Sequence, residues 1–166
     1  MKTIDDLKAA FAGESQANRK YLAWSKQADR EGYPGVAKLF RAVAAAETVH
    51  AHNHLRTLGE IKTTAENLEA AIGGEHYEVT SMYPDFMQDA EAEDEDRALK
   101  TFKWAWEVEQ VHEVMYKQAL ENLKLDSGKD LQYWVCATCG YTVTGDAPPD
   151  ICPVCNSKAS AFKEIL

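Results

Sequence analysis

The sequence predicts a mainly α-helical protein, with a four-helix bundle over residues 1–124 and a small four-cysteine domain over residues 133–166. Three observations predict this fold class. Apolar residues recur with helical spacing through most of the chain, each predicted helix carries a carboxylate on its apolar face, and all four cysteines lie in the last 31 residues. A chain of 166 residues with 45% hydrophobic content can fill one core and still form a second, smaller unit.

The first two predicted helices form a hairpin. The first begins near Thr3, where Thr3 and Asp6 have the spacing of a capping box, and ends at Gly32. The second follows the Gly-Tyr-Pro-Gly turn with helical spacing from Val36 and ends at Gly59.

The third and fourth predicted helices form the other half of the bundle. Thr63 and Glu66 form a second capping box, and we expect this helix to bend or break near Pro84. The acidic run at 89–96 predicts a turn, in which Asp94 can adopt a left-handed backbone. The last helix extends over about 97–123.

The connection between the second and third helices is longer than the turns within each pair, and this pattern is typical of a ferritin-like bundle. Residues 125–132 are polar, contain Ser-Gly and predict a linker. The remaining 34 residues are too few to fold on an apolar core alone, so a metal or a cross-link is required.

Five carboxylates fall on the apolar faces of the predicted helices: Glu14, Glu47, Glu75, Glu78 and Glu109. A single such residue is usually a boundary side chain that reaches solvent. Five of them converging in one core would cost roughly the whole stability of a domain, because an unpaired buried carboxylate costs several kcal/mol. The pattern therefore predicts a strong positive charge at the centre of the bundle.

The spacing of two histidines indicates that this charge is a pair of metal ions. Glu47-x-x-His50 and Glu109-x-x-His112 place a carboxylate and an imidazole one turn apart, as in di-iron bundles in which two other helices each add a Glu. Glu14 to Glu47 is 33 residues and Glu75 to Glu109 is 34, so the ligand layout repeats. Oxygen-rich ligands with few imidazoles favour iron or manganese over zinc.

The four cysteines form two knuckles, Cys136-x-x-Cys139 and Cys152-x-x-Cys155, which can bind one metal ion tetrahedrally. A zinc ribbon has similar spacing. The neighbouring aromatic, Gly and Pro residues favour the Fe(Cys)₄ site of a rubredoxin.

The whole chain resembles a rubrerythrin. The resemblance is carried by both cysteine knuckles and by Phe11–Ala17, Glu47–Ala51, Gly74–Glu78, Met82–Pro84 and Glu109–Glu113. It implies that Glu47 and Glu109 bridge two irons, that Glu75 and His112 are terminal ligands of one, and that Glu14 is a terminal ligand of the other. It also implies that Glu78 and His50 exchange on the second iron with oxidation state, and that Tyr21 and Tyr83 hydrogen-bond to ligands or oxidant.

The family implies a function in oxidative-stress defence. The diferrous site of such a protein reduces hydrogen peroxide to water, and the Fe(Cys)₄ centre returns electrons from an external donor, a rubredoxin or an NAD(P)H-dependent reductase. A nucleotide-binding Gly-x-Gly-x-x-Gly fingerprint is missing from the sequence. One alternative is a ferritin-like ferroxidase that handles iron. A third interpretation is an interaction module in which both metals are zinc.

Composition and chain length set further expectations. A net charge of −9 argues against nucleic-acid and anionic-membrane partners, and the absence of an apolar leader favours a cytoplasmic protein. We expect a homodimer or a higher homo-oligomer, with exchange of helices between chains left open. The linker is so short that we expect the Fe(Cys)₄ centre to serve the di-iron site of a partner chain. Trp24, Trp104 and Trp106 are interpreted as packing residues, and the roles of His52 and His54 are left open.

Overall fold

The computed structural model describes residues 1–125 and 131–166. Its elements, in chain order, are α1 (Lys2–Arg30), α2 (Pro34–Thr57), α3 (Thr64–Tyr77), the π-helical segment η1 (Glu78–Met82), α4 (Tyr83–Ala92), α5 (Asp96–Asn122), η2 (Leu123–Leu125), β1 (Tyr133–Cys136), β2 (Thr142–Thr144), η3 (Ala159–Ala161) and β3 (Phe162–Ile165). Two compact units are formed, an N-terminal unit, Met1–Lys62, and a C-terminal unit, Thr63–Leu166. This division falls within the predicted bundle, and the domain bounds expected from the sequence remain predictions.

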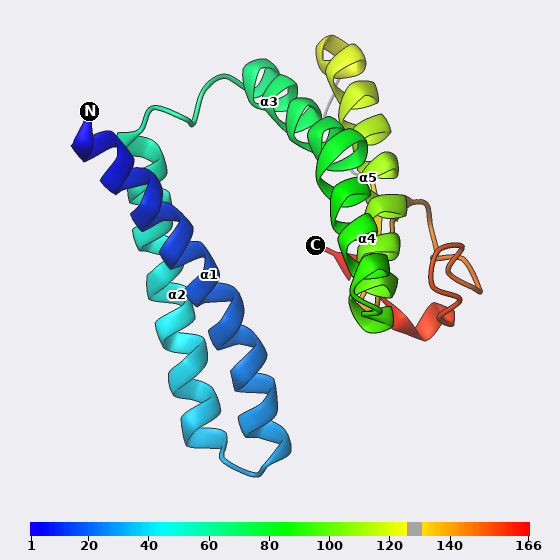
Figure 1. The fold of residues 1–166 in the computed structure, drawn as a ribbon, viewed down its shortest axis with the longest axis horizontal. Coiled ribbons are helices and arrows are strands. Elements are labelled where there is room, and N and C mark those ends of the chain that lie inside the picture. Colours follow the sequence, from blue (N-terminus) through cyan, green and yellow to red (C-terminus); the bar gives the residue numbers. More distant parts are fainter. Residues whose placement is uncertain (126–130) are drawn as a thin grey trace. The chain divides into compact units, whose positions relative to one another are not determined.

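The N-terminal unit is a hairpin in which α1 and α2 lie side by side along their length (Figure 1). Small residues form the contact between α1 and α2, which we call the alanine seam. Its buried apolar residues are Ala28, Ala37, Ala44 and Ala51. Buried Asn18 crosses this seam: its Nδ2 donates to the Ala44 carbonyl at 2.6 Å and to Thr48 Oγ1 at 2.8 Å. The two helices therefore close on each other through small side chains, and larger ones are left half-buried or exposed.

The two predicted capping boxes have different outcomes. The box at Thr63 is confirmed, because its side chain accepts from the Glu66 N–H while the Glu66 carboxylate accepts from the Thr63 N–H. The box at Thr3 is wrong. The amides of Ile4 and Asp5 donate to the Met1 carbonyl, so Met1 is the N-cap, two residues before Thr3, and Thr3 lies inside the helix.

The third predicted helix does not break at Pro84. The chain remains helical from α3 through η1 into α4, and Pro84 lies in the first turn of α4. The turn between α4 and α5 occupies 93–95, and Asp94 has the expected left-handed backbone, with φ of 55°. Both α3 and α4 pack along α5 (Figure 1).

The last part of the C-terminal unit is a three-stranded antiparallel sheet in the order β2-β1-β3. Its small core consists of Cys136, Cys152 and Phe162, with Trp134 and Tyr141 packed against them. Two of these three buried residues are cysteines, which fits the expectation that a metal supports this fold. Most of the predicted linker, 126–130, lies outside the described residues.

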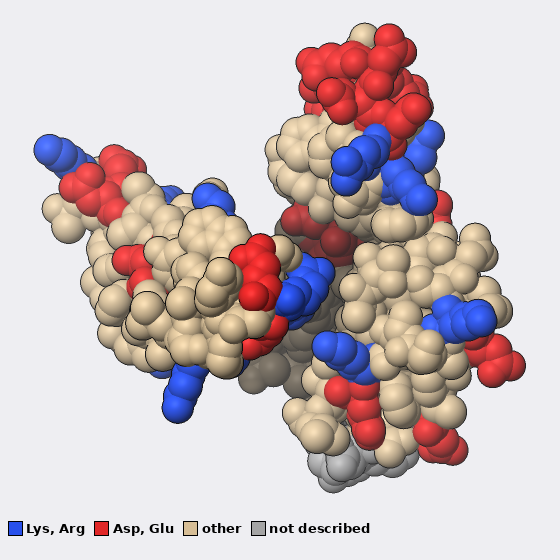
Figure 2. Space-filling model, turned by 90° about the horizontal axis from the view of Figure 1, so that it is seen from below, with Lys and Arg blue, Asp and Glu red and all other residues tan. Residues whose placement is uncertain are grey.

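On the face that Figure 2 shows there is no broad basic area: Lys and Arg occur in small groups, and acidic side chains form one large cluster and several smaller groups. Among the described residues, no helix has the length and apolar character needed to cross a membrane.

Candidate metal centres

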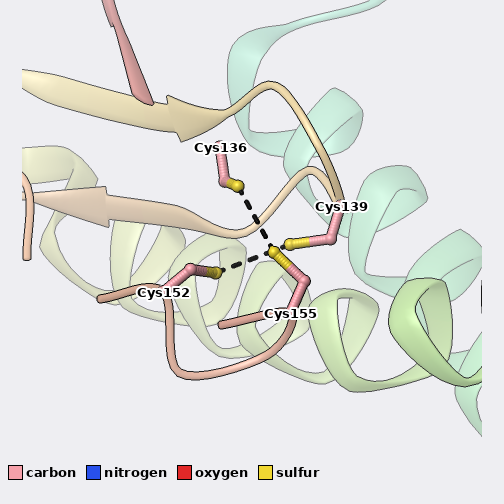
Figure 3. Close-up of side chains that lie close together, drawn as sticks. All are labelled: Cys136, Cys139, Cys152 and Cys155. Carbon is pink, nitrogen blue, oxygen red and sulfur yellow. Dashed lines mark hydrogen bonds between the residues drawn. The ribbon is translucent and has the colours of Figure 1, made fainter. Parts of the chain in front are cut away.

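The four cysteines converge at one point, from the end of β1 and from the loop before η3 (Figure 3). The sulfur atoms of Cys136 and Cys155 are 3.7 Å apart, and those of Cys139 and Cys152 are 3.6 Å apart. A metal about 2.3 Å from each of four thiolates would separate them by about 3.8 Å in a tetrahedron. Both sulfur–sulfur separations therefore suit a tetrahedral metal ion.

The two knuckles are matched turns. The Gly140 amide donates to the Cys136 carbonyl at 2.8 Å, and the Asn156 amide donates to the Cys152 carbonyl at 3.0 Å. Gly140 and Asn156, each one residue after the second cysteine of its knuckle, have left-handed φ values of 89° and 61°. Gly and Asn tolerate this conformation best, so these two residues allow the knuckles to form.

The thiols differ in acidity. Burial raises the pKa of Cys139 and of Cys152. Burial also opposes ionisation of Cys155, but contacts with Ser157, whose Oγ lies 3.2 Å from the sulfur, outweigh it and bring the pKa of Cys155 to about 7. A bound metal would ionise all four, because the thiolate is the ligand form.

The N-terminal unit brings together Glu14 of α1 with Glu47 and His50 of α2, each with a ligand atom within 4.8 Å of the others. His50 Nδ1 lies 2.8 Å from Glu47 Oε2 and 3.9 Å from Glu14 Oε1. We call this cluster the N-terminal triad. Its imidazole side chain is 54% exposed.

The C-terminal unit brings together Glu75 of α3 with Glu109 and His112 of α5 in the same way. His112 Nδ1 lies 2.6 Å from Glu109 Oε2. We call this cluster the C-terminal triad, and its residues are all half-buried. Glu75 Oε2 is buried and has no hydrogen-bond partner in the described part of the chain, which is costly unless a cation binds it.

Proton affinities in the C-terminal triad reflect crowding of acids in a partly buried space. Burial, and then the Glu109 carboxylate, raise the pKa of Glu75 to about 7. Burial opposes the charge of Glu109 as well, but its hydrogen bond to His112 prevails and lowers the pKa of Glu109. The same bond raises the pKa of His112. Paired carboxylates of this kind, with an oxygen atom left unpartnered, fit a divalent metal ion.

The other predicted ligands and neighbours lie around these clusters. Glu78 and Tyr83 are half-buried near the C-terminal triad: burial and then Glu109 raise the pKa of Glu78, and burial and then Glu78 raise the pKa of Tyr83. Tyr21 packs against the rings of Trp24 and Phe40. The ligand and hydrogen-bonding roles of all these residues remain predictions. His52 is exposed and His54 half-buried, and neither belongs to a triad.

The four-cysteine domain touches the C-terminal triad of its own chain. His112 Nε2 lies 2.9 Å from Thr142 Oγ1, and Thr142 in turn donates to the Gly140 carbonyl at 3.0 Å, next to Cys139. The expectation that the linker is too short for such an approach is therefore wrong. We expected the domain to lie beyond the end of α5, whereas the chain folds back along this helix and reaches His112. No sequence signal identified Thr142, since the contact joins residues 30 apart.

Comparisons with known proteins agree with these clusters. A family model described as Rubrerythrin matches residues 5–120, and one described as Rubrerythrin, rubredoxin-like domain, matches residues 134–163. Rubrerythrin-2 of Clostridium acetobutylicum is 33% identical over 97% of this chain and 95% of its own. Rubrerythrin of Porphyromonas gingivalis is 34% identical over 98% of this chain and 89% of its own. A structure of fully reduced, all-ferrous nigerythrin has a TM-score of 0.59, with 32% identity over 98% of this chain and 86% of the other.

These matches confirm the predicted fold class, a ferritin-like domain followed by a rubredoxin-like domain. They also confirm the two kinds of metal centre. The chain has a di-iron site of carboxylate and histidine residues, and a four-cysteine cluster for the rubredoxin-like iron.

Proposed function

We propose, because the chain belongs to the rubrerythrin family, that it is a non-haem di-iron peroxidase that reduces hydrogen peroxide to water in oxidative-stress defence. Electrons are relayed to the di-iron site through the four-cysteine iron. One observation carries this proposal: His112 of the C-terminal triad is hydrogen-bonded to Thr142 of the four-cysteine domain. An iron-storing protein has no need for such a connection.

The ligand roles follow the family pattern. Glu47 and Glu109 would each hold both irons, Glu75 and His112 would hold one of them, and Glu14 would hold the other. Glu78 and His50 would be the alternative ligands of that second iron in its two oxidation states. Each triad thus supplies three ligands of one di-iron centre, and the bridging carboxylates are the residues that pair with histidine in each triad.

The protein's own groups handle protons at this centre. A reduced di-iron pair supplies two electrons, and with two protons these convert one hydrogen peroxide to two water molecules. The Tyr83 hydroxyl is protonated at neutral pH, and burial raises its pKa further, so it can donate a hydrogen bond to an oxidant. The half-buried setting of Glu75 and His112 limits the access of bulk water.

The relay follows the contact between the two centres. It runs from Cys139 through its neighbour Gly140 to Thr142 and on to His112. A four-coordinate sulfur site changes little on one-electron transfer, which suits it to this role. The electrons come from a rubredoxin or an NAD(P)H-dependent reductase.

The decisive experiment is Cys136→Ser. The variant is expected to lose the red colour of ferric tetrathiolate and steady-state peroxide reduction, while its reduced di-iron site still reacts once with peroxide. Normal turnover with the physiological donor would show that the relay assignment is wrong. Iron that accumulates beyond three ions per chain would favour a ferroxidase, and a colourless protein loaded with zinc in the cell would favour an interaction module.

The working assembly is at least a homodimer, in which each di-iron centre takes its two triads from different chains. This inference starts from the connection between α2 and α3, residues 58–63. It is longer than the three-residue turns within each helix pair but has only six residues. Seven Cα–Cα steps reach at most ~25 Å. A ferritin-like bundle needs a long crossover at this point, because the second and third helices run parallel.

Helix lengths show why six residues are too few. Glu47 lies ten residues before the end of α2, or ~15 Å, and Glu75 lies eleven residues after the start of α3, or ~16 Å. If both reach the same metals from parallel helices, the connection must bridge ~31 Å. A second copy of the chain removes this conflict by supplying the other triad.

Mixing variants tests the exchange. Glu47→Ala disables the N-terminal triad and Glu109→Ala disables the C-terminal triad, so neither homodimer is active. A mixed dimer with exchanged triads contains one centre free of substitutions, and about half of the activity per mixed dimer should return. If mass spectrometry shows that mixed dimers form and no activity returns, each chain builds its own centre.

A further inference from the structure

The π-helical segment η1 determines which face of the helix Tyr83 occupies. It begins at Glu78, three residues after Glu75, and ends directly before the start of α4 at Tyr83. In a regular α-helix, residues five apart are separated by about 140° around the axis. A π-helical turn takes up one extra residue, so residues five apart across it are placed like residues four apart, which are separated by about 40°. The extra residue of η1 thus brings Tyr83 back to the face of Glu78. Consistent with this, Glu78, Glu109 and Glu75 all contribute to the raised pKa of Tyr83.

This register leaves the carbonyl of Val79 without its usual helical donors. Its α-helical donor would be the amide of Tyr83, but this amide donates to the Glu78 carbonyl. Its π-helical donor would be the amide of residue 84, which is a proline and has no N–H. An unpartnered carbonyl in a packed helix is unfavourable, so this register requires a donor from outside the helix.

The side chain of Trp106 supplies that donor. Its Nε1 on α5 donates to the Val79 carbonyl at 3.0 Å in a partly buried contact. Trp106 is three residues before Glu109, one turn away on the same helix. The residue is therefore attached to the element that carries two members of the C-terminal triad and bonds to the element that carries Tyr83.

We propose that Trp106 is a positioning residue, whose indole N–H holds the π-helical register of 78–82 and thereby keeps the Tyr83 hydroxyl beside the carboxylates of the C-terminal triad. Its sequence environment suggested only packing. The hydrogen bond and the register stand independently of the chemistry, whereas the effect on peroxide reduction rests on the proposed function.

The test compares Trp106→Phe with Trp104→Phe. Both replace an indole on α5 with a smaller ring, but Trp104 contacts Lys100 through its ring face, and no hydrogen bond of the described residues joins it to η1. Hydrogen–deuterium exchange across 78–83 should rise about tenfold in Trp106→Phe, as expected for one lost hydrogen bond, and stay unchanged in Trp104→Phe. Equal exchange in the two variants would overturn the proposal.

A second-site change makes the test specific to Val79. Pro84→Ala provides an amide at position 84 that can donate to the Val79 carbonyl in π-helical geometry. In this background, Trp106→Phe should change the exchange by less than about twofold. An undiminished effect would mean that Trp106 does not act through this carbonyl.

The effect of the register on peroxide reduction is measured separately, by single-turnover kinetics. Trp106→Phe and Tyr83→Phe should slow single-turnover oxidation of the reduced protein by peroxide by the same factor, and the double variant should be no slower, with iron content unchanged in all three. Additive slowing would overturn the positioning role. A wild-type protein that does not react with peroxide, yet shows the exchange effect, would refute the proposed function while the register assignment stands.

If Trp106→Phe does not fold, the wild-type protein still decides the matter. Its Trp106 indole proton should exchange with solvent far more slowly, by NMR, than that of the half-exposed Trp24. Similar rates for the two would contradict the hydrogen bond on which the proposal depends.

Discussion

The two triads contain the same Glu and Glu-x-x-His elements but lie in different surroundings. In the N-terminal triad the His50 side chain is 54% exposed, whereas His112 in the C-terminal triad is 25% exposed. The reason is what surrounds each helix pair. α1 and α2 meet through an alanine seam, while α3 and α5 are joined by α4, the bulky Trp106 and the four-cysteine domain. A shared motif thus fixes the ligands, and neighbouring elements fix their burial.

This difference separates the tasks of the two triads. The C-terminal triad has the unpartnered Glu75 oxygen, the shifted pKa values and the contact toward the four-cysteine iron. It is suited to hold a metal tightly and to receive electrons. Under the proposed function, the N-terminal triad would hold the iron whose ligands exchange, and its His50 side chain is 54% exposed in the single chain.

The largest effect is expected from removing a bridging carboxylate. Glu47→Ala and Glu109→Ala should each lose essentially both irons, because a bridging ligand binds two metals and its removal leaves the remaining buried carboxylates without compensation. Glu78→Ala is the matched control, and it should retain both irons while reacting differently with peroxide. Iron counts per chain decide the comparison, and equal losses in the three variants would contradict the ligand roles.

The second prediction concerns the pH dependence of the metal-free protein. Glu75 has its pKa raised from 4.5 to about 7 on folding, so it contributes stability below pH 4.5 that is lost as the pH rises through 7. The raised pKa of His112 acts in the same direction, because its contribution is present below pH 6.5 and is lost above. The lowered pKa of Glu109 contributes stability that is present above pH 4.5 and is lost only at lower pH, so it does not change this trend. The urea concentration at the unfolding midpoint of the metal-free protein should therefore decrease as the pH rises from 5 to 8.

A single substitution isolates the source of this dependence. Glu75→Gln should flatten the pH profile of the metal-free protein, since the amide stays neutral throughout. A profile that stays as steep in this variant would show that Glu75 is not the source of the dependence.

The sequence was sufficient for the close pairs within the candidate clusters because these pairs depend on local spacing. Glu47 and His50, or Glu109 and His112, are one helical turn apart, and each knuckle is a four-residue turn, so helical and turn geometry already bring these side chains together. The left-handed Asp94 followed from its position in a turn. These predictions needed no knowledge of how distant segments pack.

Features that depend on long-range contacts were not predictable. Pro84 alone favours a bend or a break, and only the Trp106 side chain, 27 residues beyond Val79, reveals why the helix continues with a π turn instead. The contact of Thr142 with His112 likewise depends on the path of the chain after α5. In both cases local propensity was overridden by a hydrogen bond from another element.

A smaller effect is expected at the seam of the N-terminal unit. Asn18→Ala removes two hydrogen bonds that cross from α1 to α2 and should cost about 1–3 kcal/mol of unfolding free energy, because the site is buried. Asn53→Ala, on the exposed side of α2, is the control and should change stability by less than about 0.5 kcal/mol. Chemical denaturation measures both. Equal effects would mean that the alanine seam alone holds the hairpin.

The smallest expected effect distinguishes the two helix starts, one in each unit. Thr63→Ala removes the side chain that caps α3 and should cost about 1 kcal/mol. Thr3→Ala replaces a residue of the same type that lies inside the first turn of α1, where Met1 is the N-cap, and the change should stay within about 0.5 kcal/mol of zero. The two variants differ from the native chain by the same atoms, so a difference in their denaturation midpoints measures the cap itself. A loss at Thr3 as large as that at Thr63 would show that α1 begins with a capping box in solution, and that the two units start their helices in the same way.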